Sequence, residues 1–235
     1  MKDARGSLPF GFAHRGAPHR SVEPNSLRAF QDALVAGSPG LETDVAMSKD
    51  GVPVLYHPPR FRRGLNIAGL ARSDLPHFIP SLEWLYAECG TAFQLSLDMI
   101  RPEAAGAVVE IARSYGAAER LWLTYWRVDT LRSWRERFPE VRLVYPTVPV
   151  RFVRFLNLIE RLAGAGGDAI NLHHRFSTAR AIDAIHSGGL LAFAWGVRTS
   201  GSLDRILSLG VDGVYFDTVE HMVQSRSKGG LSPDR

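Results

Sequence analysis

The chain has little cysteine and no long apolar run. The first shortage excludes an internal disulfide, and the second excludes a membrane span. Cys89 is the only cysteine among 235 residues, so no disulfide can form within the chain. A reducing compartment fits this usage, and we expect the cytoplasm. No apolar run approaches the roughly 18 residues that a membrane span needs. The first residues lack the apolar core of a signal peptide, and we expect no stable membrane insertion.

Lysine is scarce as well. It occurs only at Lys2, Lys49 and Lys228, so arginine supplies 25 of the 28 basic residues, and the formal net charge is +4. Guanidinium groups suit phosphate, which favours an anionic partner. Because the arginines are spread along the chain, we expect no nucleic acid partner and favour a small-molecule, phosphate-bearing substrate. A homo-oligomer remains open.

The remaining composition and the pattern of apolar residues indicate one barrel. A chain that is 45% hydrophobic and 22% charged suits a single globular domain over residues 1–235, with 225–235 a weakly ordered tail. Helical patterns follow the predicted strands, which are 10–14, 41–45, 93–98, 121–125, 141–146, 168–173, 190–195 and 213–217. Eight such units predict a (β/α)8 TIM barrel. An open doubly wound sheet is the alternative, but no GxGxxG turn follows the first strand.

A predicted hairpin follows the second strand. Glu42 and Asp44 are two residues apart, so on a strand both carboxylates point to one face. Asp50-Gly51 is a two-residue turn signal. With these two residues at the centre of the turn, His57 would lie directly opposite Asp44. A surface hairpin with solvated acids is the competing interpretation. Residues 58–80 then form a short loop or lid.

Polar residues gather at the ends of the predicted strands, where barrel enzymes place their active sites. These residues are His14 and Arg15, Glu42 and Asp44 with His57, Asp98, His173 and His174, Trp195, and Asp217. Three carboxylates suit Mg²⁺ or Ca²⁺ rather than zinc. Histidines exchange protons near neutral pH, and arginine can neutralise a phosphoryl oxygen. The set predicts metal-assisted cleavage of a phosphodiester.

At this point the sequence resembles the glycerophosphodiester phosphodiesterase family over about residues 10–218. The matching segments are His14-Arg15-Gly16, Asn25-Ser26 with Phe30, Glu42-x-Asp44, Lys49-Asp50-Gly51, His57, Ile79-Pro80-Ser81-Leu82, Ala194-Trp195, and Gly210-Val211-Asp212-Gly213 with Asp217. The order and spacing of these segments together form a specific signal.

The resemblance implies a metal-dependent hydrolase of lipid and glycerol metabolism that releases sn-glycerol 3-phosphate and an alcohol. It implies His14 and His57 as acid/base catalysts and Glu42, Asp44 and Asp98 as metal ligands. The neighbouring glycerol hydroxyl would attack phosphorus first and form a cyclic phosphate. Substrate contacts are expected at Arg15, Glu23, Arg101 and Trp195.

The sequence departs from the family pattern at several positions. Pro24 stands where a family glutamate is usual, Pro58 follows His57 in place of aspartate, and Ile100 replaces a lysine. These changes bear on the phosphate clamp and the headgroup. Two alternatives therefore stay open: a lysophospholipase D-like enzyme on acyl-bearing substrates, and a barrel that binds phosphodiesters with little turnover.

Several other residues receive a structural interpretation. His173 and His174 alternate sides on a strand, and Asp217 is expected to be a turn or cap residue. The apolar stripe Phe152, Phe155, Leu156, Ile159 and Leu162 could touch a membrane, but an ordinary outer barrel helix is the favoured interpretation.

Overall fold

A computed structural model describes residues 10–19, 21–57, 65–147, 151–221 and 223. The strands are β1 (Phe10–His14), β2 (Gly40–Met47), β3 (Pro53–Leu55), β4 (Gln94–Met99), β5 (Leu121–Thr124), β6 (Arg142–Thr147), β7 (Ala169–His173), β8 (Leu191–Val197) and β9 (Gly213–Phe216). The helices are α1 (Leu27–Val35), α2 (Leu82–Cys89), α3 (Ala105–Ser114), α4 (Val128–Arg137), α5 (Phe152–Gly164), α6 (Ala179–Ser187) and α7 (Ser200–Ser208).

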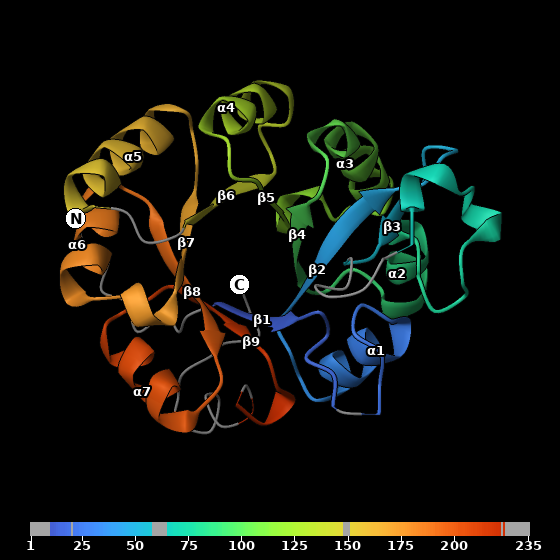
Figure 1. Ribbon diagram of the computed structural model, residues 1–235, viewed down its shortest axis with the longest axis horizontal. Helices are drawn as coiled ribbons and strands as arrows, with labels where there is room; N and C mark the ends of the chain where they lie inside the picture. Colours follow the sequence, from blue (N-terminus) through green and yellow to red (C-terminus); the bar gives the residue numbers. More distant parts are fainter. Residues whose placement is uncertain (1–9, 20, 58–64, 148–150, 222, 224–235) are drawn as a thin grey trace.

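All strands except β3 pair in parallel and close into a barrel. The sheet order is β1-β9-β8-β7-β6-β5-β4-β2-β3, and β1 also pairs with β2. Figure 1 looks down this ring, with the helices arranged around the outside. The predicted eight-stranded (β/α)8 barrel is therefore confirmed. Short 3-10 turns accompany it: η1 (Ile67–Gly69), η2 (Arg72–Asp74), η3 (Pro102–Ala104), η4 (Ala118–Arg120) and η5 (His174–Phe176).

Aromatic side chains fill the lower part of the barrel. Phe12, Trp122, Phe193 and Tyr215 are buried in one cluster. The rings of Phe12 and Tyr215 stack at 4.9 Å, and Trp122 lies 5.1 Å from Phe193. The Trp122 indole N–H donates to the side-chain oxygen of Gln94 at 2.7 Å. This aromatic plug fills the barrel at the amino-terminal ends of the strands. The barrel is therefore open to a cavity at the carboxyl ends of the strands.

The hairpin register differs from the prediction by one residue. Val45 pairs with Leu55, and the Tyr56 amide donates to the Asp44 carbonyl oxygen at 3.0 Å. Tyr56, not His57, therefore lies opposite Asp44, and the predicted pairing was wrong. The turn contains three residues rather than two, because Gly51 adopts a left-handed φ of 81° and the Ser48 amide donates to the Val52 carbonyl.

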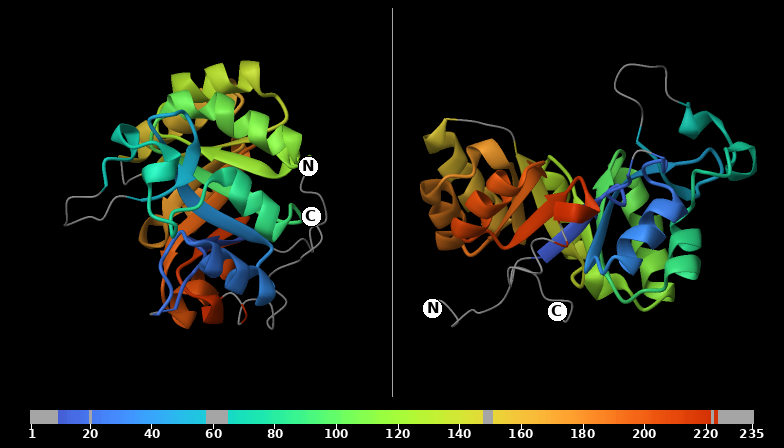
Figure 2. Two further views of the ribbon diagram at one scale, coloured as in Figure 1. Left: turned by 90° about the vertical axis from the view of Figure 1, so that its right-hand side faces the viewer. Right: turned by 90° about the horizontal axis from the view of Figure 1, so that it is seen from below.

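The segment after the hairpin packs on its own small core. Ile67, Leu75 and Ile79 are buried against Ala46 and Val54. In the right-hand view of Figure 2 the part with η1 and η2 projects beyond the barrel. Of the predicted lid at 58–80, residues 58–64 lie outside the described part of the chain, as does the predicted tail at 225–235. Residues 219–221 and 223, after β9, are helical.

The remaining helices cover the outside of the barrel. The buried side chains of α5 are Phe155, Ile159 and Leu162, which supports an outer barrel helix. Among the described residues, no helix is both long enough and apolar enough to cross a membrane.

The aromatic plug generates a stability prediction. Replacing Trp122 by Ala should lower the free energy of unfolding by about 3–5 kcal/mol, because it leaves a cavity among rigid rings. Trp126→Ala is the matched control: Trp126 is 57% exposed, so its loss should cost about 1 kcal/mol or less. Urea denaturation of the two variants measures both values. Equal losses would show that the plug contributes no more to the free energy of unfolding than an exposed side chain does.

Candidate active site

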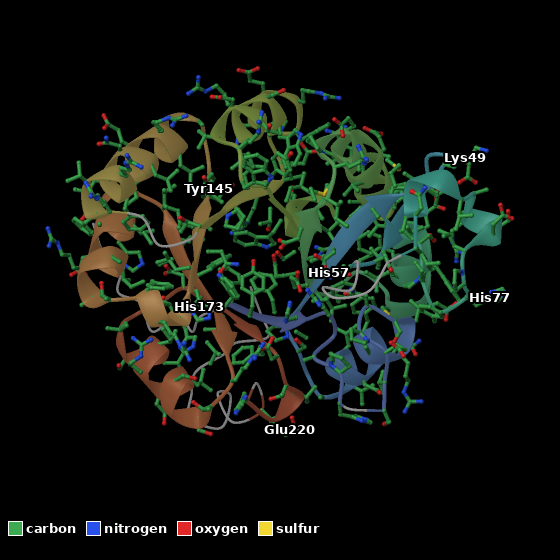
Figure 3. All side chains as sticks on the ribbon, in the orientation of Figure 1. Lys49, His57, His77, Tyr145, His173 and Glu220 are labelled. Carbon is green, nitrogen blue, oxygen red and sulfur yellow. The ribbon has the colours of Figure 1, made fainter. Side chains whose placement is uncertain are left out.

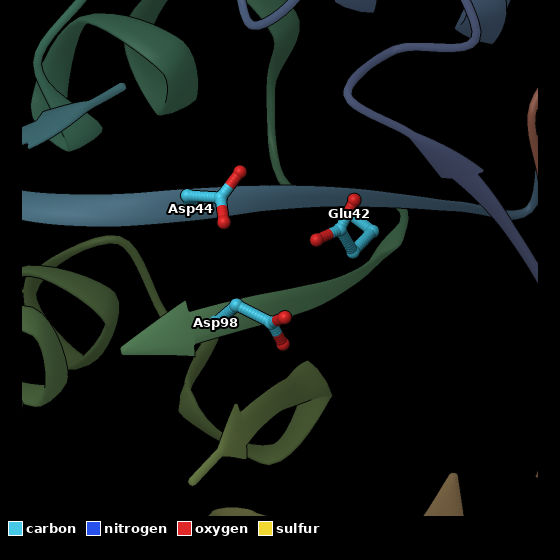
Figure 4. Close-up of side chains that lie close together, drawn as sticks. All are labelled: Glu42, Asp44 and Asp98. Atoms are coloured by element: carbon cyan, nitrogen blue, oxygen red, sulfur yellow. The ribbon is translucent and has the colours of Figure 1, made fainter. Parts of the chain in front are cut away.

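Three carboxylates form the centre of the site. The strand register places Asp44 of β2 beside Asp98 of β4, with Glu42 two residues earlier on the same face. One oxygen from each group lies within 4.8 Å of the others. Figure 4 shows the three side chains in close-up. Glu42 and Asp44 are buried, and Asp44 Oδ2 has no hydrogen-bond partner. The predicted grouping of these three acids is present.

Burial and mutual repulsion make these acids hard to ionise. Burial raises the pKa of Glu42 well above its usual range, and the charges of Asp44 and Asp98 raise it further. Burial also raises the pKa of Asp44 to about 6, against the opposing charges of Arg15 and His14. Burial and the charge of Asp44 raise the pKa of Asp98 to about 7. A divalent cation among these oxygens would remove the repulsion.

Arg15 lies at the edge of the acidic cluster. Its backbone N–H donates to the Glu42 side chain at 3.0 Å, and its Nε lies 3.5 Å from Asp44 Oδ2. The turn is tight: Arg15 has a φ of 55° and Gly16 a φ of 79°. A Cβ at Gly16 would lie 2.7 Å from Ala29 of α1, so only glycine fits between the turn and this helix.

His14 lies between two acids. Its Nδ1 is 2.6 Å from Asp217 Oδ1, and its Nε2 is 3.8 Å from Glu42 Oε2. Arg198 Nε donates to the other oxygen of Asp217 at 2.9 Å. Burial raises the pKa of Asp217, but the hydrogen bonds from His14 and Arg198 outweigh it and lower the pKa to about 2. Asp217 is therefore a carboxylate at neutral pH.

The contact with His14 corrects the expected role of Asp217 as a turn or cap residue. Two signals in the sequence could have revealed it. Asp217 directly follows the last strand, and β9 neighbours β1 once the barrel closes. An acid after β9 and a histidine at the end of β1 are then adjacent on the same rim.

One cavity of about 1660 Å³ collects most of the predicted residues. Its lining includes His14, Arg15, Glu23, Glu42, Asp44, His57, Asp98, His173, His174, Trp195 and Asp217. Figure 3 shows His57 on the side of β2 and β4 and His173 across the barrel near β7 and β8. Arg101 is not among the lining residues; it is exposed just after β4.

His173 and His174 form part of the opposite wall. The His173 ring meets Trp195 edge-on at 4.5 Å. Burial, with the charge of Arg175, lowers the pKa of His173; burial and the neighbouring His173 lower the pKa of His174. Both imidazoles are therefore neutral near pH 7 and are unsuited to donate protons there. The expectation that the two residues alternate sides on a strand, with at most one facing the site, was wrong: β7 ends at His173, His174 begins η5, and both residues line the cavity.

The acidic cluster predicts cation binding that is linked to protons. Near pH 6.5, Ca²⁺ or Mg²⁺ should displace protons from the cluster, because a bound cation favours ionised carboxylates. Affinity should rise as pH increases from 6 to 8, by up to about tenfold per unit for each proton released. Calorimetry in two buffers of different ionisation enthalpy measures the release. Asp98→Asn should release fewer protons, and binding without any release would contradict the prediction.

Comparison with known proteins gives a consistent result. The profile of the glycerophosphoryl diester phosphodiesterase family matches residues 14–85 and 81–221. A glycerophosphodiester phosphodiesterase from Bacillus altitudinis is 24% identical over 242 residues, which cover 92% of this chain and 98% of that protein.

Two solved structures share the fold. The glycerophosphodiester phosphodiesterase from Thermotoga maritima has a TM-score of 0.79 and 24% identity, covering 94% of this chain and 99% of that one. An Oleispira antarctica phosphodiesterase in complex with the product sn-glycerol-3-phosphate has a TM-score of 0.78 and 22% identity, covering 94% and 97%. From the profile match over most of its length, this chain belongs to the glycerophosphoryl diester phosphodiesterase family.

Proposed function

We propose that the protein hydrolyses glycerophosphodiesters to sn-glycerol 3-phosphate and an alcohol, with a divalent cation and two histidines. The observation that carries this proposal is the shared cavity. In a chain of this family, His14 and His57 line the same hollow as Glu42, Asp44 and Asp98. The product named for the Oleispira antarctica relative agrees with this chemistry.

Glu42, Asp44 and Asp98 would hold the cation, Mg²⁺ or Ca²⁺. Their donor atoms are all oxygen and lie within 4.8 Å of one another, and Asp44 Oδ2 is a buried acceptor that makes no hydrogen bond. All-oxygen sites are those that Mg²⁺ and Ca²⁺ prefer. When bound, the cation supplies positive charge against the phosphoryl oxygens. Arg15 adds a guanidinium beside the same cluster and would contact the phosphate.

His14 is arranged to accept a proton at Nε2. Asp217 is ionised and can only accept, so the hydrogen bond at 2.6 Å assigns the Nδ1 proton of His14 to that contact. The lone pair of Nε2 then points toward the cavity side near Glu42. Asp217 is a positioning residue that fixes the tautomer, as in other Asp–His pairs.

The reaction needs one proton taken and one proton given. A glycerol hydroxyl next to the phosphate attacks phosphorus as its proton passes to one imidazole. This imidazole belongs to one of His14 and His57, and the imidazole of the other histidine protonates the departing alcohol oxygen. A nucleophile within the substrate has a high effective concentration. Water then opens the resulting cyclic phosphate. Glu23 and Trp195, which line the cavity, would contact the glycerol or the headgroup, and Arg101 would act from the rim.

An acyl-bearing substrate is the second candidate. Leu65, Phe78 and Trp126 line the cavity and are exposed at its mouth, where they could cover part of an acyl chain. Lysophosphatidylcholine should therefore be tested beside glycerophosphocholine. A higher kcat/KM for the lysolipid, lost in Phe78→Ser, would favour this candidate.

A substrate panel tests the proposal. Purified protein with Mg²⁺ or Ca²⁺ should release sn-glycerol 3-phosphate from glycerophosphocholine or glycerophosphoethanolamine, and EDTA should abolish this. His14→Ala and His57→Ala should each lower kcat by about 10²–10⁴-fold, the usual range for a lost acid or base. His77→Ala is the control, since His77 is exposed and outside the cavity lining. Turnover of no diester with any cation would leave the binding barrel as the function.

The positioning role of Asp217 has its own test. Asp217→Asn should lower kcat about 10–100-fold with little change in KM. In a His14→Ala background the same substitution should lower kcat no further. The chain offers a matched pair outside the cavity: Asp212 Oδ2 lies 2.8 Å from His186 Nε2. Asp212→Asn should lower thermal stability while leaving kcat of the folded enzyme within about twofold. Additive losses in the double variant would refute the role.

A further inference from the structure

Large apolar side chains are exposed around the mouth of the barrel. Phe78 is 54% exposed, Trp126 57% and Val153 69%, and Ile100, Leu156 and Phe176 are also exposed. All of these residues except Phe78 lie just after a strand or in the first turns of the helix that follows it. At the opposite end, among the described residues, such side chains are few: Val35 ends α1 and Tyr115 caps α3.

Arginines accompany these side chains at the same level. Arg101, Arg127, Arg151, Arg175 and Arg198 follow β4, β5, β6, β7 and β8, and all are exposed. Consecutive strands of the barrel thus each end in a cation on this face. Exposed carboxylates lie at the same level, with Glu103 and Asp129 two residues after Arg101 and Arg127, and Arg198 pairs with Asp217, so acids offset part of this positive charge.

Two arginines near this face lie over aromatic rings, one from the set above and one from α6. The Arg127 guanidinium is 4.8 Å from the centre of the exposed Trp126 ring. Arg180 of α6 lies 3.9 Å from the ring of Phe152 at the start of α5. A cation held on an aromatic face joins apolar area and positive charge in one spot. This combination is typical of side chains at the boundary between water and lipid.

Helix α5 presents a second apolar face. Its buried residues Phe155, Ile159 and Leu162 pack against the barrel. Val153 and Leu156, one turn apart, point away from it, with Arg151 and Arg154 exposed beside them. Packing within the barrel does not use this outer face. A short, basic, amphipathic turn of this kind suits the headgroup region of an anionic bilayer.

We propose that the catalytic face of the barrel docks on an anionic lipid surface. Exposed apolar side chains would enter the headgroup region while the arginines meet lipid phosphates. A nucleic acid would satisfy the arginines but not the aliphatic Ile100, Val153 and Leu156, which cannot stack on bases. The inference concerns binding alone, so it stands or falls separately from the proposed hydrolysis.

Vesicle sedimentation tests the proposal. The protein should sediment with vesicles of equal parts phosphatidylglycerol and phosphatidylcholine and remain in solution with pure phosphatidylcholine. Raising salt from 0.1 to 0.5 M should release most of it, because the Debye length shortens. Val153→Ser/Leu156→Ser and Arg127→Gln/Arg151→Gln/Arg154→Gln should each weaken the vesicle affinity at least about tenfold.

The control is Val35→Ser, which removes an apolar side chain that is 89% exposed at the other end of the barrel and should bind vesicles as the wild type does. Absence of sedimentation with the anionic vesicles would overturn the proposal. So would equal binding to both vesicle types, or equal loss in Val35→Ser. Binding to a short oligonucleotide that is unaffected by Val153→Ser/Leu156→Ser and competes with vesicles would assign this face to nucleic acid instead.

Discussion

The repulsion among Glu42, Asp44 and Asp98 is the constraint on which the rest of the site depends. Three carboxylates within 4.8 Å, two of them buried, cannot all be ionised without positive charge nearby. Arg15 supplies part of that charge from the adjoining turn, and a divalent cation would supply the remainder. The repulsion is not relieved by movement of the acids, because the two neighbouring strands are paired in register and hold the carboxylates close together.

The second feature of the site is its division into two walls. On the side of β1 and β2, His14 and Arg15 lie beside the acids, so charged and titratable side chains form this wall. Across the cavity, the rings of His173 and Trp195 form an aromatic surface, and Arg175 and Arg198 lie beside it in the lining. The site therefore presents carboxylates on one wall and aromatic rings with arginines on the other.

Much of this arrangement could be predicted from the sequence. Alternating strands and helices specify a barrel, and in a barrel every residue that ends a strand comes to the same rim, so Glu42, Asp44 and Asp98 were found together. The hairpin register was missed because it depends on a left-handed Gly51 and on the Ser48 side chain, which accepts from the Val52 amide. The role of Asp217 was missed because it requires knowing that β9 closes against β1.

The pairing of β9 with β1 has a consequence for the order in which the site forms during synthesis. The imidazole of His14 sits at the seam where the first strand meets the last, and its partner Asp217 is 203 residues away in the chain. A ribosome-bound chain that has emerged only as far as β8 holds all three acids and both histidines, yet it has an open barrel and an unanchored His14. The hydrogen bond that holds His14 can therefore form only after the last strand has closed the barrel against the first.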